Sequence, residues 1–185
     1  MTDSKLLERA KEGTLSPQEV DRVAHALRVQ EAGRDPYTLI HILGRSGACR
    51  YRALVEQFLE FSTDPMVARI ALQVLCSHWN LVADYEEAIL RFARGVEWDI
   101  DEEVRQAAIS AAGELLRNAP AEELKHLLAA IFMNHQESQP SRQAAYFALA
   151  RAHGRSWADL PPADRTLDLD LQTDPEVIRW ATADR

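Results

Sequence analysis

The sequence predicts an all-α fold, a right-handed α-solenoid built from four to five antiparallel helix hairpins. Three observations predict it. A short pattern recurs along the chain at a nearly constant interval, each copy carries apolar residues at helical spacing, and no segment has the strict alternation of a half-buried strand. Because a single hairpin leaves one apolar stripe uncovered, we expect successive hairpins to stack and bury it.

The recurring pattern starts at a turn residue and places Val, or Ser in one copy, three positions later and Ala seven positions later. The starts lie 37, 37 and 36 residues apart, at Asp64, Asp101, Ser138 and Asp174. Asp and Ser are favoured N-caps, because their side-chain oxygens accept from the free amides of the first helical turn. Pro65 and Pro175 follow two of these caps, at a position where no amide hydrogen bond is lost. Each start therefore predicts the second helix of a hairpin.

The first helices of the hairpins are expected between the copies, at residues 49–61, 85–96 and 121–134. Each of these segments carries its own apolar residues at helical spacing. We therefore expect residues 48–185 to be repeats of about 37 residues, inside a single domain that covers residues 1–185.

The first part of the chain, residues 1–47, fits the repeat less well and is expected to form atypical capping helices. These helices are predicted over residues 3–12, 16–30 and 35–47. Ser16 and Glu19 have the three-residue spacing of a capping box, in which each side chain bonds the backbone amide of the other residue. A shortened hairpin at this end would cover the apolar face of the first regular repeat.

The second-helix pattern resembles that of a HEAT repeat, most clearly at Asp101, Val104, Arg105, Ala108 and Leu115. The resemblance covers residues 49–185, and residues 16–47 more weakly. It implies an α-solenoid and a ladder of Asp and Arg side chains that links neighbouring repeats. Arg105 and Arg142 occupy the place of the ladder arginine, whereas the first and last copies have Ala68 and Ile178 there. Such a resemblance implies an architecture and leaves the function open.

The composition is that of an ordinary soluble protein, with 46% hydrophobic and 27% charged residues. The net charge of −8 argues against sequence-independent binding of nucleic acid, which needs clustered Lys and Arg. No apolar run is long enough for a membrane span, and the first residues lack the apolar core of a signal peptide. Cys49 and Cys76 show no paired spacing, so we expect a cytoplasmic protein with free thiols.

Motifs for catalysis, metal binding or cofactor binding are not found in the sequence, so no such residues are assigned. Cys76 and His78 are two positions apart, which points them about 160° away from each other on a helix. The segment GRSGAC has neither the spacing nor the lysine of a phosphate-binding loop. We therefore expect no catalytic residue, no metal and no cofactor.

Candidate partner-binding residues come from two features of the sequence. Residues 84–103 hold eight acidic residues and two arginines, and Trp98 lies among the acids on a predicted loop. A Trp in that setting is typical of an interface anchor, or of a ring folded over the nearest helix; Trp157, beside Asp159, has the same two interpretations. The outward row of the second helices is polar, with Phe147 as the one aromatic expected to be exposed. The candidates are Trp98, Asp99, Asp101, Glu102, Gln106, Ser110, Phe147 and Arg151.

The predicted function is non-catalytic protein binding by a monomer or weak homodimer, without contact to nucleic acid or membrane. Its most specific form is an acidic clamp for a basic partner, such as an immunity protein that neutralises a nuclease toxin. The first alternative is an adaptor or assembly factor that recognises a larger complex through an apolar patch around Phe147 or Trp180. The second is a HEAT-like enzyme of the bilin lyase or DNA glycosylase type. The polar row lacks the basic, aromatic groove of a glycosylase, whereas the apolar cleft of a lyase stays open from sequence alone.

Overall fold

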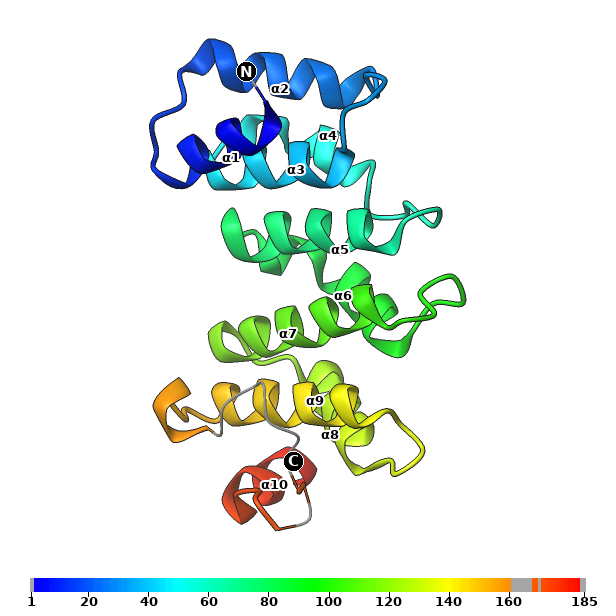
Figure 1. The fold of residues 1–185 in the computed structure, drawn as a ribbon. Helices are drawn as coiled ribbons and strands as arrows, with labels where there is room; N and C mark the ends of the chain where they lie inside the picture. Colours follow the sequence, from blue (N-terminus) through cyan, green and yellow to red (C-terminus); the bar gives the residue numbers. More distant parts are fainter. Residues whose placement is uncertain (1, 161–167, 170, 184–185) are drawn as a thin grey trace. The chain divides into compact units, whose positions relative to one another are not determined.

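The computed structural model describes residues 2–160, 168–169 and 171–183. These residues form ten α-helices and no strand, which confirms the predicted all-α class (Figure 1). Chain contacts divide the protein into two compact units, Met1–Val82 and Ala83–Arg185. The single domain and the continuous stack of hairpins remain predictions.

The first unit contains five α-helices, with α3 at its centre. They are α1 (Asp3–Lys11), α2 (Pro17–Arg28), α3 (Pro36–Arg45), α4 (Arg52–Glu56) and α5 (Pro65–Gln73). Helices α1 and α2 both pack on α3, and α3 packs on α5 (Figure 1, blue to green). The predicted capping box is confirmed, because Ser16 Oγ accepts from the Glu19 amide at 3.3 Å and Glu19 accepts from the Ser16 amide at 2.8 Å. Arg9 of α1 also pairs with Glu19, so this cap ties α1 to the start of α2.

The helix expected over residues 49–61 is broken. A 3-10 turn, Cys49–Tyr51, leads into α4, and the chain then continues in tight turns. In these turns the Phe58 amide donates to the Val55 carbonyl at 3.0 Å and the Leu59 amide to the Glu56 carbonyl at 3.1 Å. Phe58 and Leu59 are both buried, so the segment still contributes apolar surface to the core, but not as one helix.

The second unit contains the remaining five helices. They are α6 (Glu86–Arg94), α7 (Glu103–Asn118), α8 (Glu122–Met133), α9 (Gln139–Ala152) and α10 (Pro175–Thr182). Helix α6 packs on α7, α8 packs on α9, and α7 and α9 pack on each other (Figure 1, green to yellow). Helix α10 packs on α8 and α9. The long contact between α7 and α9 forms the surface on which the candidate site lies.

The first two positions of the predicted helical stripe are buried in all four copies, whereas its last position is only half-buried at His78 and Ala152. Val67, Val104 and Val177 are at most 1% exposed, and Ser141 is fully buried in the copy that lacks the Val. Ser141 satisfies its buried hydroxyl by donating to Glu102 at 2.9 Å. The alanines four positions later, Ala71, Ala108, Ala145 and Ala181, are buried as well.

Candidate functional site

The predicted partner-binding residues fall into two groups, both in the second unit. Trp98, Asp99, Asp101 and Glu102 lie in the loop before α7; Gln106 and Ser110 lie on α7, and Phe147 and Arg151 on α9. Most of the loop group takes part in an internal polar and aromatic network. Ser110, Phe147 and Arg151, by contrast, line one groove between α7 and α9.

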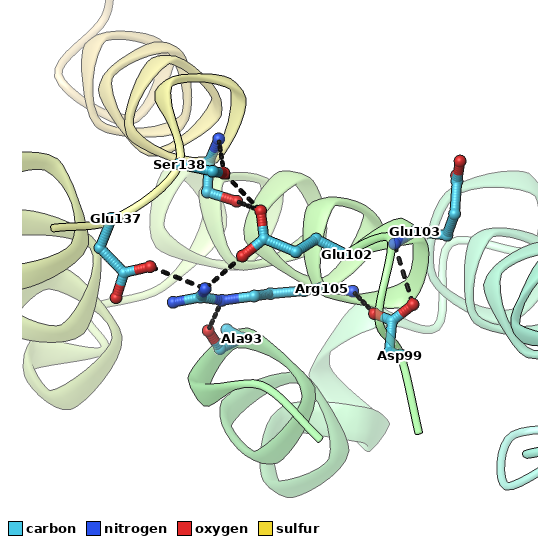
Figure 2. Close-up of polar contacts among 8 residues, drawn as sticks. Ala93, Asp99, Glu102, Glu103, Arg105, Glu137 and Ser138 are labelled. Carbon is cyan, nitrogen blue, oxygen red and sulfur yellow. Dashed lines mark hydrogen bonds and ion pairs between the residues drawn. The ribbon is translucent and has the colours of Figure 1, made fainter. Parts of the chain in front are cut away.

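Asp99 caps α7, and the predicted cap at Asp101 is wrong. Asp99 Oδ1 accepts from the Glu103 amide and Oδ2 from the Arg105 amide, each at 2.9 Å (Figure 2). The reason is a tight turn closed by the Glu102 amide and the Asp99 carbonyl at 3.1 Å, with Glu102 at a φ of +57°. The turn places Asp99 under the first amides of α7 and leaves Asp101 exposed. Asp99 is 6% exposed, and both its oxygens already have backbone partners.

Arg105 connects three segments of the second unit (Figure 2). Its Nε donates to the Ala93 carbonyl at 3.0 Å, in the last turn of α6. Its Nη1 donates to Glu102 at 2.6 Å and to Glu137, in the turn before α9, at 2.7 Å. The side chain is only 12% exposed, and the hydrogen bond that it donates to Glu137 is the largest of the effects that raise the pKa of the guanidinium. Arg105 therefore fixes the start of α7 against α6 and against the turn before α9.

Arg142, which occupies the same repeat position one copy later, makes the corresponding backbone contact. Its Nε donates to the Phe132 carbonyl at 2.9 Å, in the last turn of α8. The first copy has Ala68 at this position, and that residue is fully buried. The arginine position singled out by the repeat thus ties a second helix to the end of the helix before it, wherever arginine is present.

Glu102 is held by groups from both α7 and the α9 segment. Burial raises the pKa of its carboxyl, but hydrogen bonds from Ser138, Ser141 and Arg105 outweigh this effect and hold the pKa below its usual value of 4.5. Ser138 also caps α9 by accepting from the Ser141 amide at 3.3 Å. The carboxylate is therefore ionised and serves to connect the starts of the two helices.

Trp98 is folded over the nearest helix. Its ring is half-buried and meets Phe92 of α6 edge-on, with 6.1 Å between ring centroids. Trp180, the centre of the alternative apolar patch, is also half-buried. Its ring lies 5.3 Å from that of His153, and the Lys125 ammonium lies 5.8 Å from its centroid. Neither aromatic is available as a freely exposed anchor.

An open groove of about 190 Å³ lies between α7 and α9. Its rim is formed by side chains of three elements, among them a 3-10 turn, Trp157–Asp159, that follows α9. The larger side chains of the lining are Ser110, Glu114 and Arg117 from α7, Phe147 and Arg151 from α9, and Trp157 from the turn. The structure thus brings together three of the predicted residues and adds Glu114, Arg117 and the previously unassigned Trp157.

The floor of the groove is apolar. Phe147 is 8% exposed, so its expected exposure is wrong: it forms part of the floor and does not project from the surface. The reason is the close approach of the two helices at Gly113, where an added Cβ would lie 2.8 Å from the Ala148 Cα. A glycine inside an alanine-rich helix disfavours the helix by about 1 kcal/mol, so its presence indicates a close contact. That signal was available in the sequence.

One wall of the groove is a cation–π pair. The guanidinium of Arg151 lies 5.2 Å from the centroid of the Trp157 ring, and Arg151 Nη1 donates to the Arg155 carbonyl at 2.5 Å. These contacts hold the arginine in one orientation at the rim. The Trp157 side chain is nevertheless 64% exposed. An indole with that much free surface beside an ordered arginine is a ready contact surface for another molecule.

The groove offers groups that bind through packing and charge: an aromatic floor, an indole wall, two guanidinium groups, one carboxylate and one hydroxyl. Within the described part of the chain, no group of three or more His, Cys, Asp or Glu residues could hold a metal ion. None of the helices described there is long and apolar enough to cross a membrane. Comparison of the chain with known protein families, with curated proteins and with solved structures finds no match.

Proposed function

We propose that the chain is a protein-binding module and that the groove between α7 and α9 is its binding face in the second unit. The observation that carries the proposal is the 64% exposed Trp157, which stands beside Arg151 above the apolar floor at Phe147. Trp and Arg are enriched among the residues that contribute most to protein interfaces, particularly around a desolvated apolar pocket. This arrangement favours the adaptor type of function.

The size of the groove supports a protein partner over a cofactor. Small-molecule sites usually have a volume of about 300–1,000 Å³ and enclose most of the ligand. The groove has only about 190 Å³ and is open, which suits one large side chain of a partner. The remaining contact would come from the rim, as in ordinary interfaces where a few anchors are surrounded by weaker contacts.

The polar network at the start of α7 supports the same function by making the surface rigid. Arg105 and Glu102 join the starts of α7 and α9 through Glu137, Ser138 and Ser141. Helices fixed to one another at their starts keep their outward side chains in place before a partner arrives. Such preorganisation lowers the entropic cost of binding.

An acidic clamp for a basic partner, including the immunity protein for a nuclease toxin, is the second candidate. The observation that favours it is the exposure of four carboxylates on or near α6 and its following loop, at Glu86, Glu87, Glu97 and Asp101. Asp99 and Glu102, which the sequence also assigns to the clamp, have internal partners. The clamp would therefore rest on fewer charges than the sequence indicates.

A pull-down with purified variants tests the two candidates. The full-length chain, its Trp157→Ala variant and its Glu97→Lys, Asp101→Lys double variant are each used as bait in a lysate of the source, at low and high salt. For the groove, we expect capture that survives high salt, is lost with Trp157→Ala and persists with the double variant. Capture lost at high salt and with the double variant would support the clamp and contradict the groove.

As a check on folding, Trp157→Ala should leave the thermal unfolding midpoint nearly unchanged because the side chain is mostly exposed. A protein captured equally by all three baits would be unspecific and would contradict both candidates.

A further inference from the structure

We propose that the groove between α7 and α9 accepts an acidic peptide segment, in which a large apolar side chain is flanked by a carboxylate. The inference rests on the proposed protein-binding function and names the class of partner. The partner charge it implies is opposite to the one expected from the sequence as a whole, because two arginines and only one acid line this groove of an acidic chain.

The charge of the groove differs in sign from that of the chain. The chain has a net charge of −8, whereas the groove is lined by two arginines, Arg117 and Arg151, and one acid, Glu114. Arg117 is exposed near the end of α7, and Arg151 is half-exposed near the end of α9. The local excess of positive charge complements a carboxylate and would repel a basic segment.

Arg151 is oriented for carboxylate recognition. Its guanidinium carbon lies over the Trp157 ring, while Nη1 donates to the Arg155 carbonyl. A planar guanidinium that is already held in place loses little conformational freedom when it binds, and it matches the two oxygens of a carboxylate. The long-range attraction from Arg117 would add to this contact without needing a fixed geometry.

The apolar part of the groove specifies the neighbouring side chain of the peptide. Phe147 supplies an aromatic floor, and Ala144 and Ala148 leave space above the surface of α9. The exposed face of Trp157 closes one side. A volume of about 190 Å³ between these residues fits a single large apolar side chain, with the carboxylate placed at the arginine rim.

A nucleic acid is a poorer fit for the same residues. Binding a phosphate backbone requires several Lys and Arg along a continuous track, because affinity scales with the number of phosphates neutralised. Two arginines beside an acidic residue, on a chain with a net charge of −8, provide no such track. A short acidic peptide needs only one carboxylate contact and one apolar anchor.

The test uses a display library of random 12-residue peptides, selected against the purified full-length chain. We expect enriched peptides to combine Leu, Phe or Trp with a nearby Asp or Glu. Synthetic fluorescent versions of those peptides are then titrated against variants. Arg117→Glu and Trp157→Ala should each weaken binding by about tenfold or more, the scale expected for losing one charge-assisted contact or one anchor. The double variant Arg117→Glu, Arg151→Glu should select Lys-containing or Arg-containing peptides in a fresh round.

Arg94→Glu is the matched control, because Arg94 is an exposed arginine of the same unit that pairs with Glu123 and does not line the groove. It should leave peptide affinity unchanged. Arg117→Glu alone keeps the test valid if replacing Arg151 disturbs the fold, since Arg117 is exposed.

Three results would overturn the inference. They are enrichment of basic peptides, acidic peptides whose affinity ignores both Arg117→Glu and Trp157→Ala, and no enrichment in any round. None of these decides the proposed function, which depends on capture of a protein partner by the full-length bait. Loss of that capture with Trp157→Ala, combined with selection of basic peptides, would keep the groove as the binding face and reject only the acidic segment.

Discussion

Each unit of the protein contains a carboxylate held by an arginine and by serine, and the two clusters are assembled over different distances along the chain. In the first unit Glu19 is bound by Ser16, three residues away, and by Arg9, ten residues away. In the second unit Glu102 is bound by Arg105 locally, but also by Ser138 and Ser141, which are 36 and 39 residues away.

The difference lies in what each carboxylate stabilises. Hydrogen bonds from Arg9 and then Ser16 lower the pKa of Glu19 to about 2, and they act within a helix cap and its neighbouring helix. The partners of Glu102 belong to a different helix, so its contacts form only when α7 and α9 are packed. The first arrangement stabilises a local turn, whereas the second couples α7 to α9 and supports the groove between these two helices.

Arg105→Ala should have the largest effect on the second unit. It leaves Glu102 and Glu137 without their half-buried cation and the Ala93 carbonyl without its donor. We expect a loss of about 3 kcal/mol in the free energy of unfolding, measured by urea denaturation. Arg94→Ala, which removes an exposed ion pair with Glu123, should cost less than about 1 kcal/mol. Equal effects of the two variants would contradict a special role for Arg105.

The two units differ in the atoms that lie next to a glycine at a helix contact. An added Cβ at Gly113 would lie 2.8 Å from the Ala148 Cα, whereas at Gly44 of α3 it would meet the methyl groups of Val74. We expect Gly113→Ala and Gly44→Ala each to cost about 2 kcal/mol. Adding Val74→Ala should reduce the cost of Gly44→Ala, while Ala148→Gly should not rescue Gly113→Ala, because the backbone stays in place. Double-mutant cycles in urea check both statements; rescue in the second unit would show that the helices can separate there.

Asp99→Ala should cost about 1.5 kcal/mol, because two amides of α7 lose their acceptor. Asp101→Ala, two positions along at the residue predicted from the repeat, should change the free energy of unfolding by less than about 0.5 kcal/mol. Thermal and urea unfolding of the two variants compare them directly. A larger effect at Asp101 would mean that the repeat position, and not the turn at Glu102, decides the cap.

The smallest expected effect is on the dependence of stability on pH. The folded pKa values of Glu102 and Glu19 both lie below 4.5, so their contributions are complete above that pH and are lost as it falls. For Glu19 the loss extends down to about pH 2. Glu102→Gln should therefore flatten the decline in unfolding midpoint below pH 4.5, measured by circular dichroism. An unchanged slope would mean that Glu102 protonates alike in the folded and unfolded chain.

The sequence by itself determined the helical class, the interval of the repeated pattern and the two positions of that pattern that are buried in every copy. It also identified the caps whose acceptor lies a few residues from its donor, such as Asp64, Ser138 and the box at Ser16. These features follow from spacing along the chain, since helical periodicity and N-caps depend on residues within one or two turns of each other. The segment after Cys49 shows that apolar spacing predicts where a helical segment begins better than how long it runs, because the expected helix is reduced to a 3-10 turn and the short α4.

Only the tertiary structure decided which side chains are free to meet a partner. Asp99 and Glu102 looked like surface acids, yet the first caps a helix and the second satisfies the hydroxyls of Ser138 and the buried Ser141. Phe147 forms part of the floor of the groove between α7 and α9, and Trp157 forms one exposed wall of that groove. The cap at Asp99 is local, four and six residues from its donors, and depends on the turn at Glu102. The hydrogen bonds of Glu102 join residues 36 and 39 positions apart, and the burial of Phe147 follows from the approach of α9 to Gly113. Those contacts exist only once α7 and α9 are packed together.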